Sequence, residues 1–182
     1  MTKILVVSDS HKHNATLNQI FNNHKDIDTC IHCGDLQDDK NNLHIQNLMI
    51  VSGNNDFNLY DDEILCQIEN LSVFICHGHL YQIEDTKRLL EETALEKKAQ
   101  LVLFGHTHHP EFYEKDGIHY LNPGSVAFPR GGKVFVPTYA IIEIGQTLTC
   151  HFYHAKTHED VSSKVLALKE PKKSFFSRFK RQ

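Results

Sequence analysis

Residues 4–11 read ILVVSDSH, a short aliphatic run that ends in serine, aspartate and histidine. Four consecutive aliphatic residues are typical of a buried strand, because a strand covered on both faces is apolar at every position. The same succession of an apolar run and a polar ending recurs four more times before residue 110. The five runs and their endings are 4–7 before SDSH, 29–31 before HCGD, 48–51 before SGNND, 73–76 before HGH and 101–104 before GHTH. This pattern predicts five short buried strands that each lead into a polar loop.

The segments between and after these runs predict a mixed α/β domain. Residues 14–24 carry apolar side chains at helical spacing after Asn14, a candidate helix cap. Residues 84–99 carry an apolar stripe among charged residues, which predicts a second helix. After residue 110, strand-like segments alternate with glycine-containing turns, and an antiparallel second half is expected. These segments are 112–113, 118–121, 139–144 and 148–153.

The composition is that of a single packed domain. With 182 residues, of which 40% are hydrophobic, the chain is long enough to bury one core. No stretch approaches the roughly 18 apolar residues of a membrane-spanning helix, so we expect no transmembrane segment. The N-terminal apolar run is too short for a signal peptide, which favours a cytoplasmic location. The five cysteines are an odd number, and a disulfide framework is not expected.

Charge is divided unevenly along the chain. Residues 169–182 hold six basic and one acidic side chain, a net charge of +5, and the whole chain carries −4, so residues 1–168 carry −9. An acidic body lacks the basic face that duplex nucleic acid requires, and a duplex partner is not expected. We predict a domain over residues 1–168 and a mobile, basic, phenylalanine-containing tail over residues 169–182. A membrane surface, a nucleic acid and an oligomer contact stay open as roles for this tail.

The polar endings supply side chains that bind metal ions. If the five strands share one sheet, their carboxyl ends meet at one edge, where ligands of open α/β sheets bind. The chain has fourteen histidines, and several of them stand at these endings beside aspartate and asparagine. Imidazole and carboxylate groups are the usual ligands of Zn²⁺, Mn²⁺ and related ions. The ligand candidates are too many for one ion. Two ions about 3.5–4 Å apart, which generate a bridging hydroxide and clamp a phosphoryl group, fit the number better.

In this order, the five endings resemble the motifs of a known family. Residues 9–11 (DSH), 34–35 (GD), 53–56 (GNND), 77–79 (HGH) and 105–108 (GHTH) are similar to the five motifs of the calcineurin-like metallophosphoesterases. The short length, with NPGS at 122–125 and PR at 129–130, resembles the small prokaryotic phosphodiesterase branch of the YfcE type. The resemblance covers roughly residues 3–153. Each motif alone is a weak signal, whereas five in order are a specific one.

The resemblance implies a fold and a set of metal ligands. The fold is an α/β four-layer α/β/β/α sandwich, in which two mixed sheets are flanked by helices. The cofactors are two divalent metal ions, with Mn²⁺ the usual choice in vitro and Ni²⁺, Zn²⁺, Fe or Mg²⁺ as alternatives. The implied ligands are Asp9, His11 and His108 for one ion, Asn54, His77 and His106 for the other, and Asp35 as the bridge between them.

One position departs from the family pattern. Many members carry a histidine after the motif asparagine, where it protonates the leaving group, but this chain has Asn55. An amide cannot supply a proton, and general acid catalysis contributes about 10²–10⁴-fold. We therefore expect aryl leaving groups to react faster than alkoxides, with His79 or water as substitute donor. The catalytic candidates are Asp35, Asn54 and His79, and Arg130 is a candidate contact for the substrate phosphate.

Several of these residues also have a plain structural interpretation. Asn54 suits a turn, because Gly-Asn-Asn-Asp is good turn chemistry. Asp56 is expected to be a turn residue or to orient a metal ligand. Arg130 precedes two glycines and is open to interpretation as an isolated surface charge. We expect the histidines outside the predicted site, His32 among them, to be surface or strand residues.

These observations predict a metal-dependent phosphodiesterase that hydrolyses small phosphodiesters through a metal-bridging hydroxide. A first alternative is a protein-binding scaffold of the same fold, as in the retromer subunit that resembles this family. A second alternative is a phosphomonoesterase, which the missing histidine at position 55 disfavours. The predicted partner is a small phosphodiester substrate, and a homo-oligomer is left open.

Overall fold

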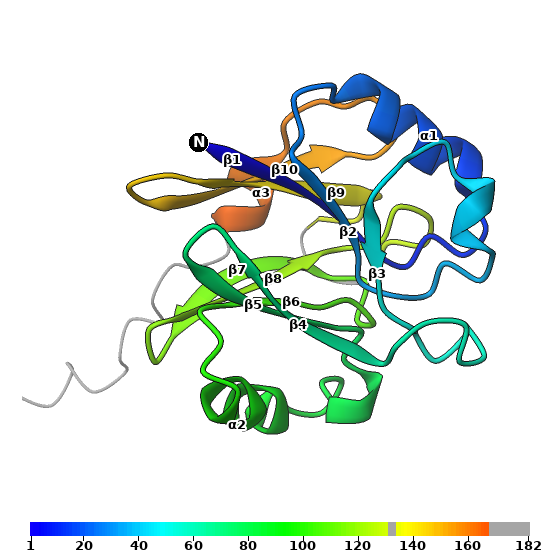
Figure 1. Ribbon diagram of the computed structural model, residues 1–182. Coiled ribbons are helices and arrows are strands. Elements are labelled where there is room, and N and C mark those ends of the chain that lie inside the picture. Colours follow the sequence, from blue (N-terminus) through cyan, green and yellow to red (C-terminus); the bar gives the residue numbers. More distant parts are fainter. Residues whose placement is uncertain (131–133, 168–182) are drawn as a thin grey trace, which may run out of the picture.

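Within residues 1–130 and 134–167, which the structure describes, ten strands form two mixed five-stranded sheets in this computed structural model (Figure 1). The predicted tail, 169–182, lies outside the described residues. No helix within the described ranges is long and apolar enough to cross a membrane.

The first sheet contains three of the predicted strands in parallel. Its β1 strand pairs with β2, and β2 pairs with β3, all in the same direction. On its other side β1 pairs with β9 in the opposite direction, and β10 completes that edge. In spatial order the strands are β10 (Leu148–His154), β9 (Thr138–Ile144), β1 (Thr2–Val7), β2 (Thr29–His32) and β3 (Leu48–Ile50).

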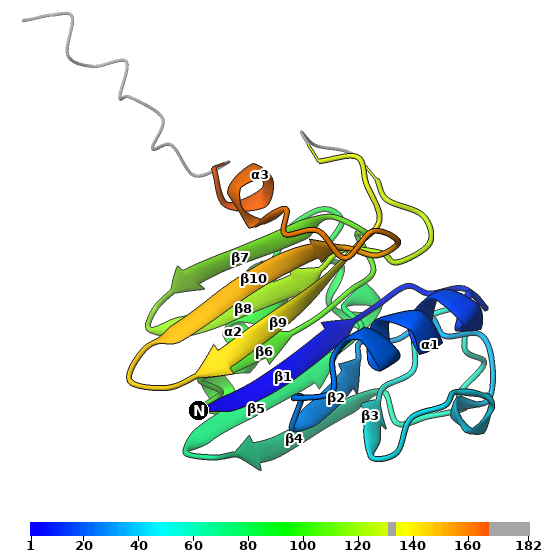
Figure 2. The ribbon, with the colours of Figure 1, turned by 90° about the horizontal axis from the view of Figure 1, so that it is seen from above.

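The second sheet contains the other two predicted strands. Strands β5, β6 and β8 are parallel to one another, and antiparallel β4 and β7 form the edges. In spatial order the strands are β4 (Glu63–Ile68), β5 (Leu71–Cys76), β6 (Leu101–Leu103), β8 (Ile118–Pro123) and β7 (Pro110–Lys115). Figure 2 shows that the strands of the two sheets run in roughly the same direction.

Helices cover the outer face of each sheet and give the predicted four layers. In Figure 1, α1 (Asn14–Asn23) lies above the first sheet and α2 (Arg88–Glu96) lies below the second. The short α3 (Ser162–Leu166) packs against β10 and β7. Two 3₁₀ turns complete the helical segments, at Lys40–Asn42 and His79–Tyr81.

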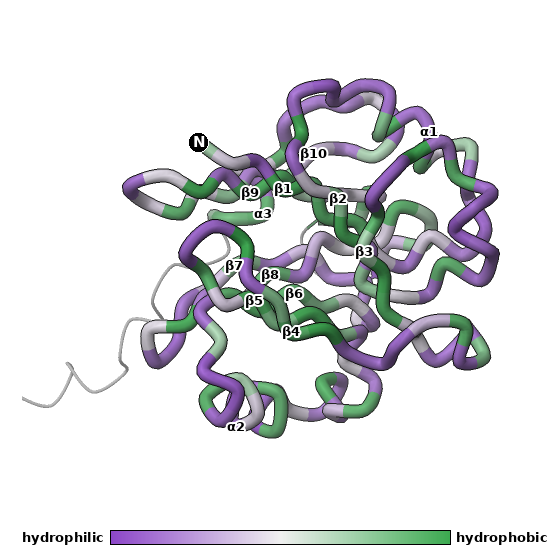
Figure 3. The backbone as a smooth tube through the Cα atoms, in the orientation of Figure 1, coloured by the Kyte–Doolittle hydropathy of each residue, from purple (hydrophilic) through white to green (hydrophobic). Residues whose placement is uncertain are grey.

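The burial of β1 explains why its sequence is apolar at every position. Ile4 and Val6 belong to the apolar cluster between the sheets, which also holds Val73 and Ile75 of β5. Leu5 and Val7 point the other way and pack in the cluster beneath α1. Successive side chains of a strand face opposite sides, so a strand between two apolar layers needs both sets. Figure 3 shows the same arrangement as hydrophobic strands surrounded by hydrophilic loops.

The structure differs from the sequence prediction in how the strands are shared. The five strands do not form one sheet: three lie in the first sheet, while β5 and β6 lie in the second. Their carboxyl ends nevertheless meet, because both parallel sets run toward the same end of the sandwich. The amide of Asp9 after β1 donates to the Gly34 carbonyl after β2, and the amide of His106 after β6 donates to the Asp9 side chain.

Element boundaries also differ from the sequence prediction. Helix α2 begins at Arg88 rather than at residue 84, because a 3₁₀ turn and further turns occupy the preceding loop. The cap of α1 is His13, and the Asn14 side chain instead donates to Asp38, 2.6 Å away. Strand β4 has no counterpart in the prediction, although its side chains alternate between exposed and half-buried.

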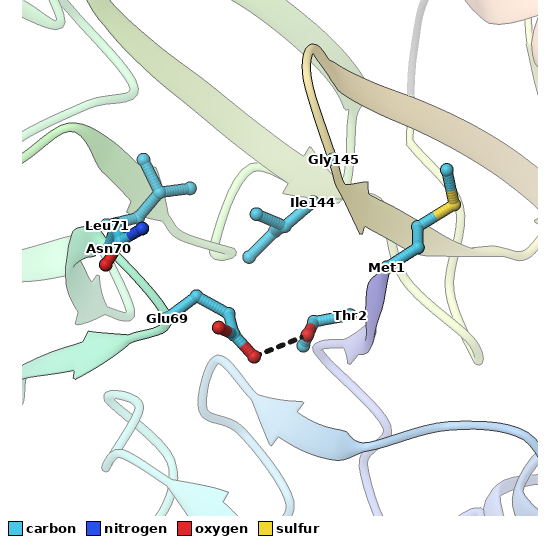
Figure 4. A pocket seen from close by; sticks show the side chains of 7 residues that line it. All are labelled: Met1, Thr2, Glu69, Asn70, Leu71, Ile144 and Gly145. Carbon is cyan, nitrogen blue, oxygen red and sulfur yellow. Dashed lines mark hydrogen bonds between the residues drawn. The ribbon is translucent and has the colours of Figure 1, made fainter.

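The opposite end of the sandwich holds a shallow pocket that is unrelated to the polar loops. It lies at the start of β1, beside the β4–β5 and β9–β10 turns, where Thr2 Oγ1 donates to Glu69 Oε1 at 2.7 Å (Figure 4). Met1 and Ile144 also line it. Because β1 and β5 both begin at this end, the pocket is separated from the polar loops by the length of the strands.

A buried tyrosine joins two histidines on the outer face of the first sheet. The Tyr139 hydroxyl lies 2.7 Å from His24 Nε2 and 3.2 Å from His158 Nδ1. Burial lowers the pKa of both histidines from the ordinary value of 6.5. In the unfolded chain these histidines bind protons more readily. The two histidines therefore do not lower the free energy of unfolding above pH 6.5, where they are neutral in both states. This free energy falls as the pH decreases from 6.5 toward the lowered pKa values.

We expect the double variant His24→Gln, His158→Gln to reduce the loss of stability on acidification. Urea denaturation between pH 7.5 and 5 measures the change in the free energy of unfolding for both proteins. Other buried histidines contribute to the wild-type slope, so the difference between the two slopes is the informative quantity. Identical slopes would contradict the role assigned to this pair.

Candidate metal centre

The loops that follow β1, β2, β5 and β6 bring six of the seven predicted ligands to one end of the sandwich. Each loop begins where a buried strand ends, so the strands fix the positions of the first polar residues. Asp9, Asp35, His77 and His108 are almost completely buried. The six residues are Asp9, His11, Asp35, His77, His106 and His108.

Asp9 lies at the centre of this group. Its Oδ2 accepts hydrogen bonds from Ser8 Oγ at 2.6 Å and from the His106 amide at 3.1 Å. Its Oδ1 lies 3.1 Å from His108 Nε2 and 3.8 Å from His77 Nε2. Desolvation alone would raise the pKa of Asp9, but the two imidazoles and the Ser8 hydroxyl lower it to about 2. Asp9 is therefore a buried carboxylate that carries a negative charge.

Two of the histidines have a tautomer that the structure determines. Nδ1 lies 2.7 Å from the Cys33 carbonyl in His77 and 2.6 Å from the Phe128 carbonyl in His108. A carbonyl can only accept, so Nδ1 carries the hydrogen and Nε2 of a neutral ring carries a lone pair. Both Nε2 atoms face Asp9 Oδ1. This orientation, with Nδ1 held by a carbonyl, is how proteins present histidine to a metal ion.

Three buried atoms of the group have no hydrogen-bond partner within the described residues. They are Asp9 Oδ1, His11 Nε2 and His77 Nε2. Buried polar atoms are costly unless they are satisfied, and both the Asp9 Oδ1 carboxylate oxygen and the lone pair of His77 Nε2 attract positive charge. The Asp9 carboxylate raises the pKa of His108 against the opposing effect of desolvation. The residues thus fit a cation.

The candidate ligand atoms form two overlapping groups. One group consists of Asp9, His11 and His108, and the other of Asp9, Asp35 and His77, with the atoms of each group within 4.8 Å of one another. The first matches the triad that the family resemblance implies. Asp35 Oδ2 lies 3.9 Å from His11 Nε2 and 3.6 Å from His77 Nε2, between a candidate ligand of each ion. Two adjacent divalent cations suit this arrangement.

His106 and Asn54 are arranged differently from the other predicted ligands. The His106 ring lies 5.1 Å from that of His77, but its Nε2 is 3.1 Å from Glu84 Oε1. Asn54 is exposed, and its side chain makes no hydrogen bond to the rest of the described chain. The neighbouring Asn55 contacts Asp35 instead, through its backbone N at 2.8 Å and its side-chain Nδ2 at 2.6 Å.

The two further candidates lie at the margin of the group. The His79 ring is 5.4 Å from that of His77, and its buried Nδ1 has no hydrogen-bond partner in the described part of the chain. Desolvation, with the neighbouring His77 and His106, lowers the pKa of His79. Arg130 is exposed, and its amide donates to the His108 carbonyl at 3.5 Å. Both residues therefore lie beside the candidate ligands rather than among them.

The backbone at the candidate ligands is unusual. Five of the seven have positive φ angles between 43° and 67°, a region that L-amino acids other than asparagine, aspartate and histidine seldom adopt. Strained conformations of this kind persist only where surrounding contacts fix them. Here the amides of Asp9 and His11 donate to the carbonyls of Gly34 and Asp35 at 3.0 and 2.9 Å. The loops after β1 and β2 therefore hold each other in place.

Asp56 links the loops after β2 and β3. Its Oδ2 accepts from the amides of Asp35 and Gly53, both at 2.7 Å, and its Oδ1 accepts from the Gln37 amide at 2.6 Å. Asp56 is completely buried. Gly53 lies so close to Asp35 that an added Cβ would be 2.1 Å from Asp35 Oδ1. The GNND motif thus positions Asp35, the predicted bridge.

Sequence reasoning missed a second set of buried polar residues beneath the site. His32 lies in β2, as a strand residue, but it is completely buried, and burial lowers its pKa to about 3. It is therefore neutral, accepts from the Gly34 amide and pairs with Ser10 Oγ at 2.9 Å. Ser125 Oγ donates to the Asp9 carbonyl at 2.8 Å. Ser10 and His32 belong to the polar endings SDSH and HCGD, and this position was the one sequence signal that they lie near the site.

Comparison with known proteins identifies the family of this chain. The model of the calcineurin-like phosphoesterase superfamily domain matches residues 2–147. The chain belongs to this superfamily. Members of the metallophosphoesterase family use divalent metal ions, and the predicted family and fold are both confirmed.

Three proteins illustrate what this chain is similar to. The phosphodiesterase MJ0936 of Methanocaldococcus jannaschii is 30% identical over 164 residues, 78% of this chain and 92% of that protein. A solved structure from Streptococcus pneumoniae, described as a predicted phosphoesterase, has a TM-score of 0.81 and 28% identity and covers 87% of this chain and 92% of that one. Vps29 of Entamoeba histolytica, solved with Zn²⁺, has a TM-score of 0.70 and covers 87% of this chain and 96% of that one, but at 22% identity it shows the fold alone.

We expect Asp56→Ala to lower the free energy of unfolding by about 3 kcal/mol or more, because two buried amides and one partly buried amide lose their acceptor. Asp85→Ala, at an exposed position of the loop before α2, is the matched control and should change it by less than about 0.5 kcal/mol. Urea denaturation of both variants measures the effect. Equal stability of the two variants would show that Asp56 does not hold these loops.

Proposed function

We propose that this protein is a metal-dependent phosphodiesterase that acts on small phosphodiesters. The observation that carries the proposal is the convergence of Asp9 Oδ1, His11 Nε2 and His77 Nε2, all buried and all without a hydrogen-bond partner in the described residues. The similarity to a protein named as a phosphodiesterase supports the choice of reaction.

The residues have distinct roles in this proposal. Asp9, His11 and His108 would hold one divalent ion and His77, His106 and Asn54 the other. Asp35 would lie between the two ions, and Mn²⁺ is the proposed metal. Bound ions of this kind supply an activated water and neutralise the charge of the phosphoryl group. Ser8, Asn55 and Asp56 would keep the two carboxylates oriented through the hydrogen bonds described above.

The protein's own groups also limit its substrates. The net charge of −9 on residues 1–168 repels long polyanions, so small phosphodiesters are proposed rather than duplex nucleic acid. Arg130 is exposed beside His108 and is proposed to contact a substrate phosphate oxygen. A cytoplasmic location is proposed on the sequence argument alone, and the oligomeric state is open.

The proposed ligands argue against the scaffold alternative. An impaired metal site would show a ligand position filled by a residue that cannot coordinate a metal. All seven predicted positions carry ligand-competent residues, and six of them meet at one end of the sandwich. The structural likeness to Vps29 shows the fold alone and gives no support for a shared partner.

We expect bis(p-nitrophenyl) phosphate to be hydrolysed faster than p-nitrophenyl phosphate in the presence of Mn²⁺. Release of p-nitrophenolate, followed by absorbance, measures both rates. Asp35→Asn should reduce the diesterase rate by about a hundredfold or more, because it removes the charge between the two candidate groups. Removal of metal by EDTA should abolish the rate, and added Mn²⁺ should restore it. Full activity in the Asp35→Asn variant would overturn the two-metal assignment.

The absence of a proton donor at Asn55 predicts that the reaction rate depends on the leaving group. Because an amide cannot protonate a departing alkoxide, p-nitrophenyl diesters should react far faster than alkyl diesters. Asn55→His should narrow this gap by raising the ratio of the alkyl-diester rate to the p-nitrophenyl-diester rate, by about tenfold or more. Phosphate-ester products quantified by ³¹P NMR measure both. Equal wild-type rates for the two ester classes would contradict the expectation.

A further inference from the structure

Exposed apolar side chains gather on the loops around the candidate metal centre. Phe57, Leu59, Leu80 and Phe128 are all more than half exposed, and each belongs to a loop at the carboxyl end of a strand. Burial of apolar surface stabilises a protein by about 25 cal/mol per Å², so a phenylalanine left in water forfeits that stabilisation. Within the described chain, Phe128 is the one of these four whose ring contacts a predicted ligand.

Phe128 stands directly beside the first candidate group. Its ring centroid lies 5.3 Å from that of His11, at an interplanar angle of 50°, and 5.4 Å from that of His13, edge to face. Half of the residue, 51%, remains exposed. One part of the ring therefore packs on two histidines while the rest faces solvent at the edge of the site.

The backbone of Phe128 is fixed relative to the candidate ligands. Its amide donates to Ser125 Oγ at 2.8 Å, and its carbonyl accepts from His108 Nδ1 at 2.6 Å. Ser125 Oγ in turn donates to the Asp9 carbonyl at 2.8 Å. Two of the proposed ligands of one ion are thus tied to the residue that carries the exposed ring.

We propose that Phe128 is a stacking surface for a planar aromatic group carried by a substituent of the substrate phosphate. The inference rests on the proposed function, because the candidate metal centre must hold the phosphoryl group for the ring to lie within reach of its substituent. A flat apolar face gains from stacking on an aryl group or a nucleobase, and gains little from a methyl group. Phe128 is therefore a residue that determines specificity.

Binding of two phosphonates tests the inference without any turnover. Phenylphosphonate and methylphosphonate share the oxyanion and differ in the aromatic group. Calorimetric titration of the Mn²⁺-loaded full chain measures both dissociation constants. We expect Phe128→Ala to weaken phenylphosphonate binding by about fivefold or more and methylphosphonate binding by less than about twofold.

Three controls separate stacking from a general structural effect. Phe128→Tyr keeps the ring and should retain phenylphosphonate affinity within about twofold. Leu95→Ala removes a comparably exposed apolar side chain from α2 and should leave both affinities unchanged. Because Phe128→Ala also removes the ring that packs on His11, its metal content is measured and all titrations are made at saturating Mn²⁺, where a change in metal affinity does not favour one phosphonate over the other.

Each outcome distinguishes the inference from the proposed function. Failure of the wild type to bind either phosphonate would overturn both. Equal loss of both phosphonates in Phe128→Ala, or no loss, would overturn the stacking role alone. Thymidine 5′-monophosphate separates the two aromatic sources: a parallel loss of its affinity indicates a nucleobase, whereas an unchanged affinity restricts the surface to simple aryl esters.

Discussion

The buried carboxylate of Asp9 is the charge on which the rest of the site depends. It is completely buried where the two sheets meet, and the Nε2 atoms of His77 and His108 face its Oδ1. A buried charge is tolerated only when it is paired or coordinates a metal. The Ser8 hydroxyl and the His106 amide satisfy Oδ2 alone. Asp9 Oδ1 is thus the atom of the first sheet's loop on which histidines from the second sheet converge.

The surrounding loops supply the rigidity that such a site requires. Positive φ angles at Asp9, His11, Asp35, His106 and His108 would each be unfavourable in an isolated loop. The amides of neighbouring loops and the Asp56 carboxylate, which accepts three of them, hold the backbone in these conformations. The residues with unfavourable backbone angles are therefore held by hydrogen bonds from their immediate neighbours. The apolar core between the two sheets lies beneath them.

The layers followed from the family resemblance, whereas the position of the polar residues at strand ends could be read from the sequence because it is a local property. The sequence did not predict that β5 and β6 leave the first sheet, because pairing depends on contacts between distant segments. Likewise, the burial of His32 beneath Ser10 and the contact of Asn55, rather than Asn54, with Asp35 depend on how separate loops meet. The position of a side chain that directly follows one strand was predictable, whereas a contact between side chains of two separate loops was not.

The two groups of candidate ligands differ in how much of their geometry is already set. In the first, the His108 ring is held through Nδ1, and His11 packs between His108 and Phe128. In the second, His77 is held in the same way, but His106 is engaged by Glu84, a mostly exposed side chain. Preorganised ligands bind more tightly than ligands that must first be released from another partner. We therefore expect the Asp9–His11–His108 group to hold its cation more tightly than a site that needs His106, and Phe128 lies beside that group.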